Sequence, residues 1–225
     1  CVGKMMGRES GSAASHPDPL LGLNEDQRAA VLSEPDVPLM IFAGAGSGKT
    51  RTLCRRIAYA LRCGERPSSI LCLTFSRNAA DELRHRVGEI CSDATARQCT
   101  VATFHSFCLR VLRRHLPRHQ QRYGYSEGFT ICARDEQQEI LNGCLDLWLA
   151  GPAGAREKEE LKQRGEQARA VTVRSLAKAI EQLKTAAANS AVDDRLTFVA
   201  NHYRACMQRS NMLDFSDLLL LAIRL

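Results

Sequence analysis

The glycine-rich run at residues 43–50, AGAGSGKT, constrains the fold of this chain more than any other feature. It follows a short apolar run at residues 39–42, LMIF, and precedes a segment whose apolar residues recur at helical spacing. We therefore expect a strand, a tight loop and then a helix over residues 50–62. Three glycines allow the loop amides to converge on one anion, toward which the helix N-terminus also points. The run predicts a phosphate-binding loop.

Particular roles follow for the residues of this loop. Lys49 can reach the β- and γ-phosphates of a nucleoside triphosphate, and the Thr50 hydroxyl can ligate Mg²⁺, so these two residues are the catalytic candidates. Arg51, just past the loop, suits either support of the nucleotide or the helix surface. The strict pattern has glycine where this chain has Ala43. The predicted nucleotide-binding residues of the loop are Ala43, Gly44, Ala45, Gly46, Ser47, Gly48, Lys49, Thr50 and Arg51.

Composition excludes several broad classes. Apolar residues make up 44% and charged residues 25% of the 225 positions, which is typical of a soluble globular protein. No apolar run approaches the roughly 18 residues of a membrane span, so we expect no membrane partner. Ten cysteines without a CxxC pair favour buried thiols and an intracellular location, the nucleus in a eukaryote or the cytoplasm in a bacterium. The net charge of +6 favours polyanionic partners.

Strands alternate with helices in the first half of the chain, which predicts an α/β fold with a parallel sheet. Expected strands lie at residues 39–42, 70–75 and 100–103, and expected helices at residues 50–62, 77–90 and 105–115. Residues 1–20 lack periodicity and are expected to form a disordered leader. Residues 117–212 show helical patterns at 135–149, 171–187 and 191–207 and no convincing strand. The charged stretch 156–170 fits either a solvated helix or a mobile connector.

Gln27 precedes the loop in the segment LNEDQRAAV at residues 23–31. Asn24 suits the N-cap of a helix whose first turn carries acidic residues, which gives this segment a structural interpretation. A glutamine amide also donates and accepts at once, as N6 and N7 of adenine require. Gln27 is therefore added to the predicted nucleotide-binding residues.

Two further segments end predicted strands: LTFSRNAA at residues 73–80 and TFHSF at residues 103–107. The carboxyl ends of parallel strands form the edge at which doubly wound sheets bind ligands. Each segment offers an aromatic ring and hydroxyl groups beside basic residues, which suits single-stranded nucleic acid without sequence preference. The alternative is that Phe75 and Phe104 are core aromatics, and Phe107 is assigned to the core.

Taken in order, these segments resemble the UvrD/Rep/PcrA group of superfamily 1 DNA helicases. Gln27 matches the adenine-reading glutamine of that group, and residues 43–50 match its motif I. Residues 74–80 and 103–107 are similar to its motifs Ia and Ib. Residues 214–219, DFSDLL, resemble the acidic-aromatic helix that precedes its motif II. Asp217 in this helix is expected to have a structural or helix-capping role.

The resemblance implies a RecA-like P-loop NTPase sheet, subdomain 1A, with an inserted helical subdomain, 1B. Subdomain 1A would comprise residues 21–116 and 213–225, and 1B residues 117–212. ATP and Mg²⁺ are the implied cofactors, and single-stranded DNA and single–double-strand junctions the implied partners, with 3′-to-5′ translocation. The implied DNA-binding residues are Thr74, Phe75, Arg77, Thr103, Phe104 and His105. Arg110, Arg113, Arg114, Arg118 and Arg122 suit either duplex phosphates or a solvated face.

The chain begins at Cys1, ends at Leu225 inside an apolar helical pattern, and contains no motif II. We therefore expect the N-terminal portion of a longer helicase, with weak or absent ATP·Mg²⁺ binding and near-background hydrolysis on its own. Three alternatives stay open at this point. They are an AddA-like or RecB-like helicase–nuclease subunit, a naturally short non-catalytic ATP- or DNA-binding module, and a P-loop ATPase that acts on something other than nucleic acid.

Overall fold

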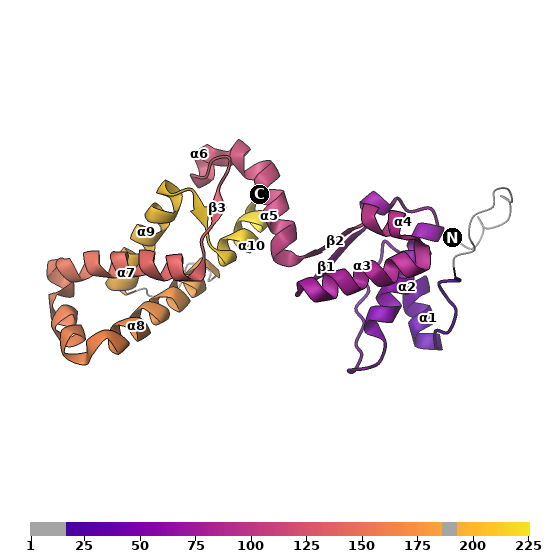
Figure 1. Ribbon diagram of the computed structural model, residues 1–225, viewed down its shortest axis with the longest axis horizontal. Helices are drawn as coiled ribbons and strands as arrows, with labels where there is room; N and C mark the ends of the chain where they lie inside the picture. Colours follow the sequence, from indigo (N-terminus) through magenta and orange to yellow (C-terminus); the bar gives the residue numbers. More distant parts are fainter. Residues whose placement is uncertain (1–16, 186–192) are drawn as a thin grey trace. The chain divides into compact units, whose positions relative to one another are not determined.

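The computed structural model describes residues 17–185 and 193–225, and the chain divides into two compact units between Phe104 and His105 (Figure 1). Most of the leader expected at residues 1–20 lies outside the described residues. None of the helices in the described part of the chain combines the length and the apolarity that a membrane crossing needs.

The first unit is a small α/β arrangement in which β1 and β2 pair in parallel, with Cys72 opposite Val101. This confirms a parallel sheet and an α/β fold for the region. Strand β2 occupies the predicted residues, and β1 is one residue shorter than predicted at each end. The elements are α1 (Glu25–Leu32), α2 (Lys49–Arg62), a 3₁₀ turn (Pro67–Ser69), β1 (Leu71–Thr74), α3 (Arg77–Cys91), α4 (Asp93–Gln98), β2 (Thr100–Thr103) and the start of α5 (Phe104–His115).

Local capping and a shared core explain these elements. Asn24 caps α1 by accepting a hydrogen bond from the Gln27 amide at 2.8 Å, and Ser76 caps α3 by accepting from the Ala79 amide at 3.2 Å. The apolar faces of α2 and α3 meet the sheet at Cys72 in one buried cluster. Its buried members are Cys54, Ile57, Cys72, Ala80, Leu83, Val87, Ala96, Cys99 and Val101.

The strand predicted at residues 39–42 is wrong, because the structure has irregular chain there. Met40 is 74% exposed and Phe42 is 87% exposed, so this apolar run is not in the core. A strand forms when its amides and carbonyls find a neighbouring strand. Among the described residues, β1 and β2 pair only with each other, and residues 39–42 have no ladder partner.

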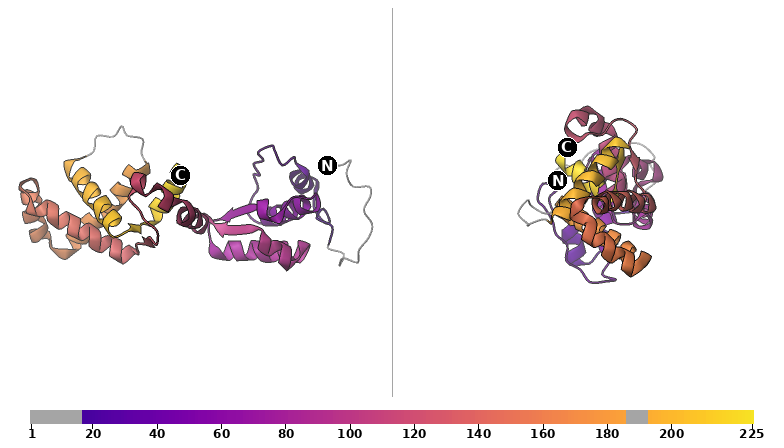
Figure 2. Two further views of the ribbon diagram at one scale, coloured as in Figure 1. Left: turned by 90° about the horizontal axis from the view of Figure 1, so that it is seen from above. Right: turned by 90° about the vertical axis from the view of Figure 1, so that its left-hand side faces the viewer.

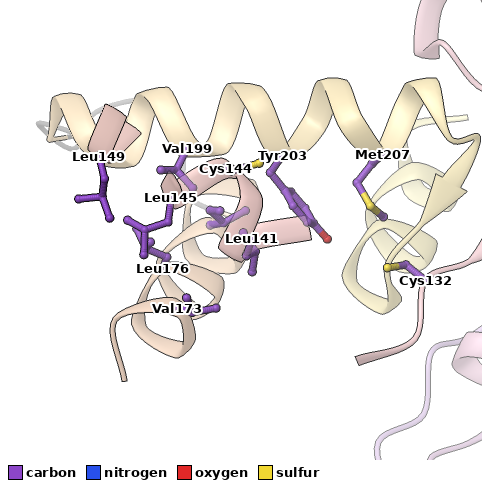
Figure 3. Close-up of a cluster of buried hydrophobic side chains, with 11 residues drawn as sticks. Cys132, Leu141, Cys144, Leu145, Leu149, Val173, Leu176, Val199, Tyr203 and Met207 are labelled. Atoms are coloured by element: carbon purple, nitrogen blue, oxygen red, sulfur yellow. The ribbon is translucent and has the colours of Figure 1, made fainter. Parts of the chain in front are cut away.

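The second unit is mainly helical, with α7 packed against α8 and α9 (Figures 1 and 2). Its elements are the rest of α5, a 3₁₀ turn (Leu116–His119), α6 (Gln120–Tyr123), β3 (Thr130–Ile131), α7 (Arg134–Ala150), a second 3₁₀ turn (Pro152–Gly154), α8 (Ala155–Thr185), α9 (Asp194–Arg209), β4 (Met212–Leu213) and α10 (Phe215–Arg224). Figure 3 shows Leu141, Cys144 and Leu145 of α7 pointing into the core beneath α9.

One sequence prediction for this unit is wrong, and one pair of alternatives is decided. The sequence predicts no strand within residues 117–212, yet β3 pairs in parallel with β4, Thr130 opposite Met212 and Ile131 opposite Leu213. Two-residue strands are too short to show a period in the sequence. The charged stretch 156–170 is helical rather than a connector, although α8 is broken at Gly165, whose φ is 78°. Part of the helix predicted at 191–207 lies outside the described residues.

Candidate functional site

The glycine-rich loop leads into α2 through two left-handed glycines. Gly46 has φ 77° and Gly48 has φ 83°, a region that residues with a Cβ rarely adopt. Gly48 is the N-cap of α2 and supplies no side-chain cap. Within the part of the chain that the structure describes, the amides of Lys49 and Thr50 donate no hydrogen bond. These first-turn amides and the positive end of the helix dipole suit an anion.

The Lys49 ammonium lies over the same loop. It donates to the carbonyl oxygens of Ala43 at 2.8 Å and Gly44 at 2.6 Å. Ser47 Oγ also donates to the Gly44 carbonyl, at 2.8 Å, which closes the turn. No carboxylate of the described residues forms an ion pair with Lys49. Its positive charge is held by neutral carbonyls and stays available to a phosphate.

Gln27 joins α1 to the loop. Its Oε1 accepts from the Asn24 amide at 3.2 Å, which completes a capping box, and its Nε2 donates to the Ser47 carbonyl at 3.0 Å. A Cβ at Gly48 would lie 3.0 Å from Nε2, so glycine permits this approach. A glutamine amide has two N–H donors and two lone pairs on its oxygen. One donor and one lone pair of Gln27 therefore remain after both contacts.

Arg51 takes a different direction from the loop residues. Its guanidinium lies against Gly22, where a Cβ would come within 2.7 Å of Nη2. The side chain is exposed on α2. This placement favours the helix-surface interpretation of Arg51 over support of the nucleotide.

Two aromatic rings stand at the carboxyl ends of the paired strands. Phe75 follows β1 and is 95% exposed, and Phe104 follows β2 and is 38% exposed. Their ring centroids lie 5.4 Å apart with the planes tilted by 44°. Such exposure contradicts the core interpretation of Phe75. A parallel sheet brings both strand ends to one edge, so the two rings form a shared aromatic surface.

The neighbours of these rings are polar. Thr74 Oγ1 donates to the Ser76 carbonyl at 2.9 Å and so shapes the turn into α3. Arg77 is the first residue of α3 and is exposed, while Thr103 is the last residue of β2. His105 belongs to the second unit, where its ring and the Phe215 ring form a T-shaped pair with 5.6 Å between centroids.

Comparison with known proteins gives a family match over most of the chain. Residues 23–225 match the model of the UvrD/REP helicase N-terminal domain. The chain belongs to this family. It is 36% identical over 213 residues to the ATP-dependent DNA helicase UvrD1 of Mycobacterium leprae, covering 91% of this chain and 26% of the relative. It is 32% identical over 218 residues to the ATP-dependent DNA helicase PcrA of Bacillus subtilis, covering 92% of this chain and 26% of the relative. The chain thus spans about a quarter of the length of these relatives.

In this UvrD/REP-family chain, one charged network was not anticipated from the sequence. Lys184 Nζ lies 2.6 Å from Asp214 Oδ2 and 2.7 Å from Asp217 Oδ1. Tyr203 OH donates to Asp214 Oδ2 at 2.8 Å, and Ser216 Oγ donates to Asp214 Oδ1 at 2.7 Å. The network ties α8, α9 and the start of α10 together.

Of the two roles expected of Asp217, it has the structural one, through its ion pair with Lys184. The cap of α10 is Asp214, which accepts a hydrogen bond from the Asp217 amide at 2.9 Å. Burial raises the pKa of Asp214, but the Lys184 ammonium and the hydrogen bonds to the carboxylate outweigh it, so the pKa lies below its usual value. At Asp217 the balance is reversed. Burial and the negative charge of Asp214 raise the pKa of Asp217 more than the Lys184 ammonium lowers it, so this pKa lies above its usual value. Asp214 and Asp217 stand out in the sequence as acidic residues at a predicted helix start. No sequence pattern indicates that the distant Lys184 forms ion pairs with them.

The basic series of the second unit is exposed along and beyond α5. The Arg110 guanidinium lies 5.8 Å from the centre of the Phe107 ring, and Arg122 lies 5.3 Å from that of Tyr123. Phe107 is half-buried. The remaining members, Arg113, Arg114 and Arg118, are exposed. These positions fit either interpretation of the series.

Proposed function

We propose that this chain is the N-terminal ATP-binding part of an ATP-dependent DNA helicase that translocates 3′ to 5′ on single-stranded DNA and unwinds duplexes. The observation that carries the proposal is the phosphate loop with Gln27 at its side and an aromatic pair at the sheet edge. The relatives are named ATP-dependent DNA helicases, which supports the same activity. Residues 21–116 and 213–225 correspond to 1A, and residues 117–212 to the inserted helical 1B.

Within this proposal, Lys49 binds the β- and γ-phosphates of ATP, and Thr50 supplies a hydroxyl ligand to Mg²⁺. The left-handed glycines and the uncapped start of α2 fit a bound phosphate, because no side chain fills that position. Bound Mg²⁺ supplies charge neutralisation during phosphoryl transfer. The chain's own residues position the nucleotide. Hydrolysis by residues 1–225 alone stays near background, and single–double-strand junctions are the substrate of the whole protein.

Replacing Gln27 by alanine in the whole protein is expected to weaken ATP binding by about tenfold and GTP binding much less, because a bidentate contact to adenine discriminates by roughly 1–3 kcal/mol. The remaining N–H and lone pair of Gln27 are the groups that would read adenine. Competition of ATP and GTP for a fluorescent nucleotide measures both affinities. Gln98→Ala, an exposed glutamine at the end of α4, is the matched control. Equal weakening of ATP and GTP would contradict base reading.

The DNA-binding part of the proposal is tested at Phe75. Phe75→Ala is expected to weaken binding of an oligo(dT) strand by about 5- to 150-fold, since stacking of a base on an aromatic ring contributes roughly 1–3 kcal/mol. Fluorescence anisotropy of a labelled oligonucleotide measures the affinity. Phe42→Ala removes a similarly exposed ring of the same unit and is the control. If both variants bind like the wild type, the aromatic pair is not a DNA surface.

A further inference from the structure

The described cysteines are all free thiols, and two of them meet between helices of the second unit. Cys144 lies on α7 and Cys206 lies on α9, and both side chains pack in the same apolar core. Figure 3 shows Cys144 pointing toward α9. The two thiols are hydrogen-bonded to each other, so only a small side-chain movement separates their sulfur atoms from bonding distance.

The two thiols have different surroundings. Cys144 is 2% exposed, and burial, with a smaller effect of the Cys206 sulfur, raises its pKa to about 11. Cys206 is half-buried, and Arg209 Nη2 donates a hydrogen bond to its sulfur at 3.3 Å. A cation beside a sulfur stabilises the thiolate, which is the form that reacts with oxidants. Cys206 is therefore the accessible and activated member of the pair, and Cys144 is a buried thiol behind it.

A second pair of neighbouring thiols lies in the first unit and provides a comparison. Burial, with a smaller effect of the Cys99 thiol, raises the pKa of Cys72 to about 11. Both of these side chains are buried. An oxidant therefore has no route to either sulfur while the unit is folded, and we expect this pair to stay reduced.

We propose that Cys206 is an oxidation site at which a hydroperoxide produces an intramolecular disulfide with Cys144. In the first step the Cys206 thiolate attacks the O–O bond, which breaks. Cys206 becomes a sulfenic acid, and the departing oxygen takes up a proton and leaves as an alcohol, or as water from hydrogen peroxide. In the second step the Cys144 sulfur attacks the Cys206 sulfur, the S–O bond breaks, and the Cys144 proton leaves with the hydroxyl as water.

The electrons balance, because the two thiols lose two electrons and the hydroperoxide gains them. The disulfide would close residues 144–206 into a loop that contains the whole of α8. Such a link restricts the unfolded chain, so the oxidised protein should unfold at a temperature about 5–15 °C higher than the reduced one. A thiol reductant should reverse the change. The site goes beyond the proposed function, because no step uses ATP or DNA.

Peptide mapping of the 225-residue chain tests the site. The chain is treated with a small excess of hydrogen peroxide, free thiols are alkylated, and the protein is digested with trypsin without reduction. Cleavage after arginine releases Cys144 in residues 135–156 and Cys206 in residues 205–209, with one cysteine in each peptide. Mass spectrometry should find these two peptides linked, and dithiothreitol should separate them. Alkylated or sulfinic Cys206 without the linked peptide would overturn the proposal.

Variants identify which thiol reacts first. In Cys144→Ala the sulfenic acid should persist at Cys206, where a 1,3-dicarbonyl reagent traps it, whereas in Cys206→Ala the buried Cys144 should stay reduced. Trapping at Cys144 instead would overturn the assignment. Cys132→Ala, which removes another buried thiol of the same core, is the control and should form the link as the wild type does. The map of the wild type decides the outcome if a core variant does not fold.

The role of Arg209 is tested by the rate of oxidation. Arg209→Gln should slow formation of the link by about 3- to 10-fold, because the Cys206 thiolate loses its neighbouring cation. Arg204→Gln removes the same charge from an exposed position of the same helix and should react at the wild-type rate. Equal rates in the two variants would overturn activation by Arg209. Failure of this site would leave the proposed ATP and DNA binding untouched.

Discussion

Replacing Lys49 by alanine in the whole protein is expected to lower DNA-stimulated ATP hydrolysis by about 10²–10³-fold, the usual effect of losing one group that stabilises transferred charge. The Lys49 ammonium rests on the carbonyls of Ala43 and Gly44, at the loop where the β- and γ-phosphates would bind. Phosphoryl transfer depends on positioning and charge stabilisation, so removing this cation raises the barrier to hydrolysis.

Phosphate release with saturating single-stranded DNA measures this effect. Lys162→Ala, on the exposed surface of α8, is the control for loss of a lysine. Thermal unfolding of both variants separates loss of activity from loss of structure. Wild-type rates in Lys49→Ala would mean that the loop does not hold the reacting phosphates, and the proposed function would fail with it.

Local signals in the sequence are enough to predict the loop and most helices. Asn24 and Ser76 cap the helices that follow them, and β2 lies where its apolar run predicts. These features depend on residues a few positions apart, which a sequence displays directly. The sequence does not decide the exposure of Phe75, because an aromatic residue at a strand end suits a core and a binding surface equally.

Features that depend on distant pairing were predicted wrongly or missed. The apolar run at residues 39–42 has the composition of a strand. A strand also needs a neighbouring strand to pair with, and the periodicity of a sequence does not identify that neighbour. The β3–β4 pair joins Thr130 to Met212 across α7, α8 and α9. No sequence pattern predicts that Arg134 and Arg174 lie on the wall of one cavity, because only the fold brings α7 and α8 together there.

Removing the charge of Lys184 is expected to destabilise the second unit by about 3–5 kcal/mol at pH 7, the usual cost of leaving a buried ionic group without its partner. The Lys184 side chain is 14% exposed, and those of Asp214 and Asp217 are 7% and 16% exposed. In Lys184→Met, two neighbouring buried carboxylates lose the cation that they share. Burial and mutual repulsion then raise the pKa of both above the unfolded values.

The sign of the pH dependence follows from these pKa directions. In the wild type the lowered pKa of Asp214 contributes stability above its unfolded pKa, and this is lost only as the pH falls through the folded value. The raised pKa of Asp217 acts in the opposite direction, so the two contributions partly cancel. In Lys184→Met the folded state binds protons more tightly than the unfolded state, so its free energy of unfolding rises as the pH falls from 7 toward 5. The difference between the two proteins should therefore be larger at pH 7 than at pH 5.

Urea unfolding followed by the fluorescence of Trp148, the single tryptophan, measures the second unit specifically. Lys178→Met, on the same helix but without an ion pair among the described residues, should stay within about 0.5 kcal/mol of the wild type. Lys184→Arg keeps the charge and should recover part of the loss, which preserves the test if the methionine variant does not fold. A destabilisation by Lys184→Met that is the same at both pH values would mean that poorer packing, rather than the two carboxylates, accounts for it, because packing does not titrate.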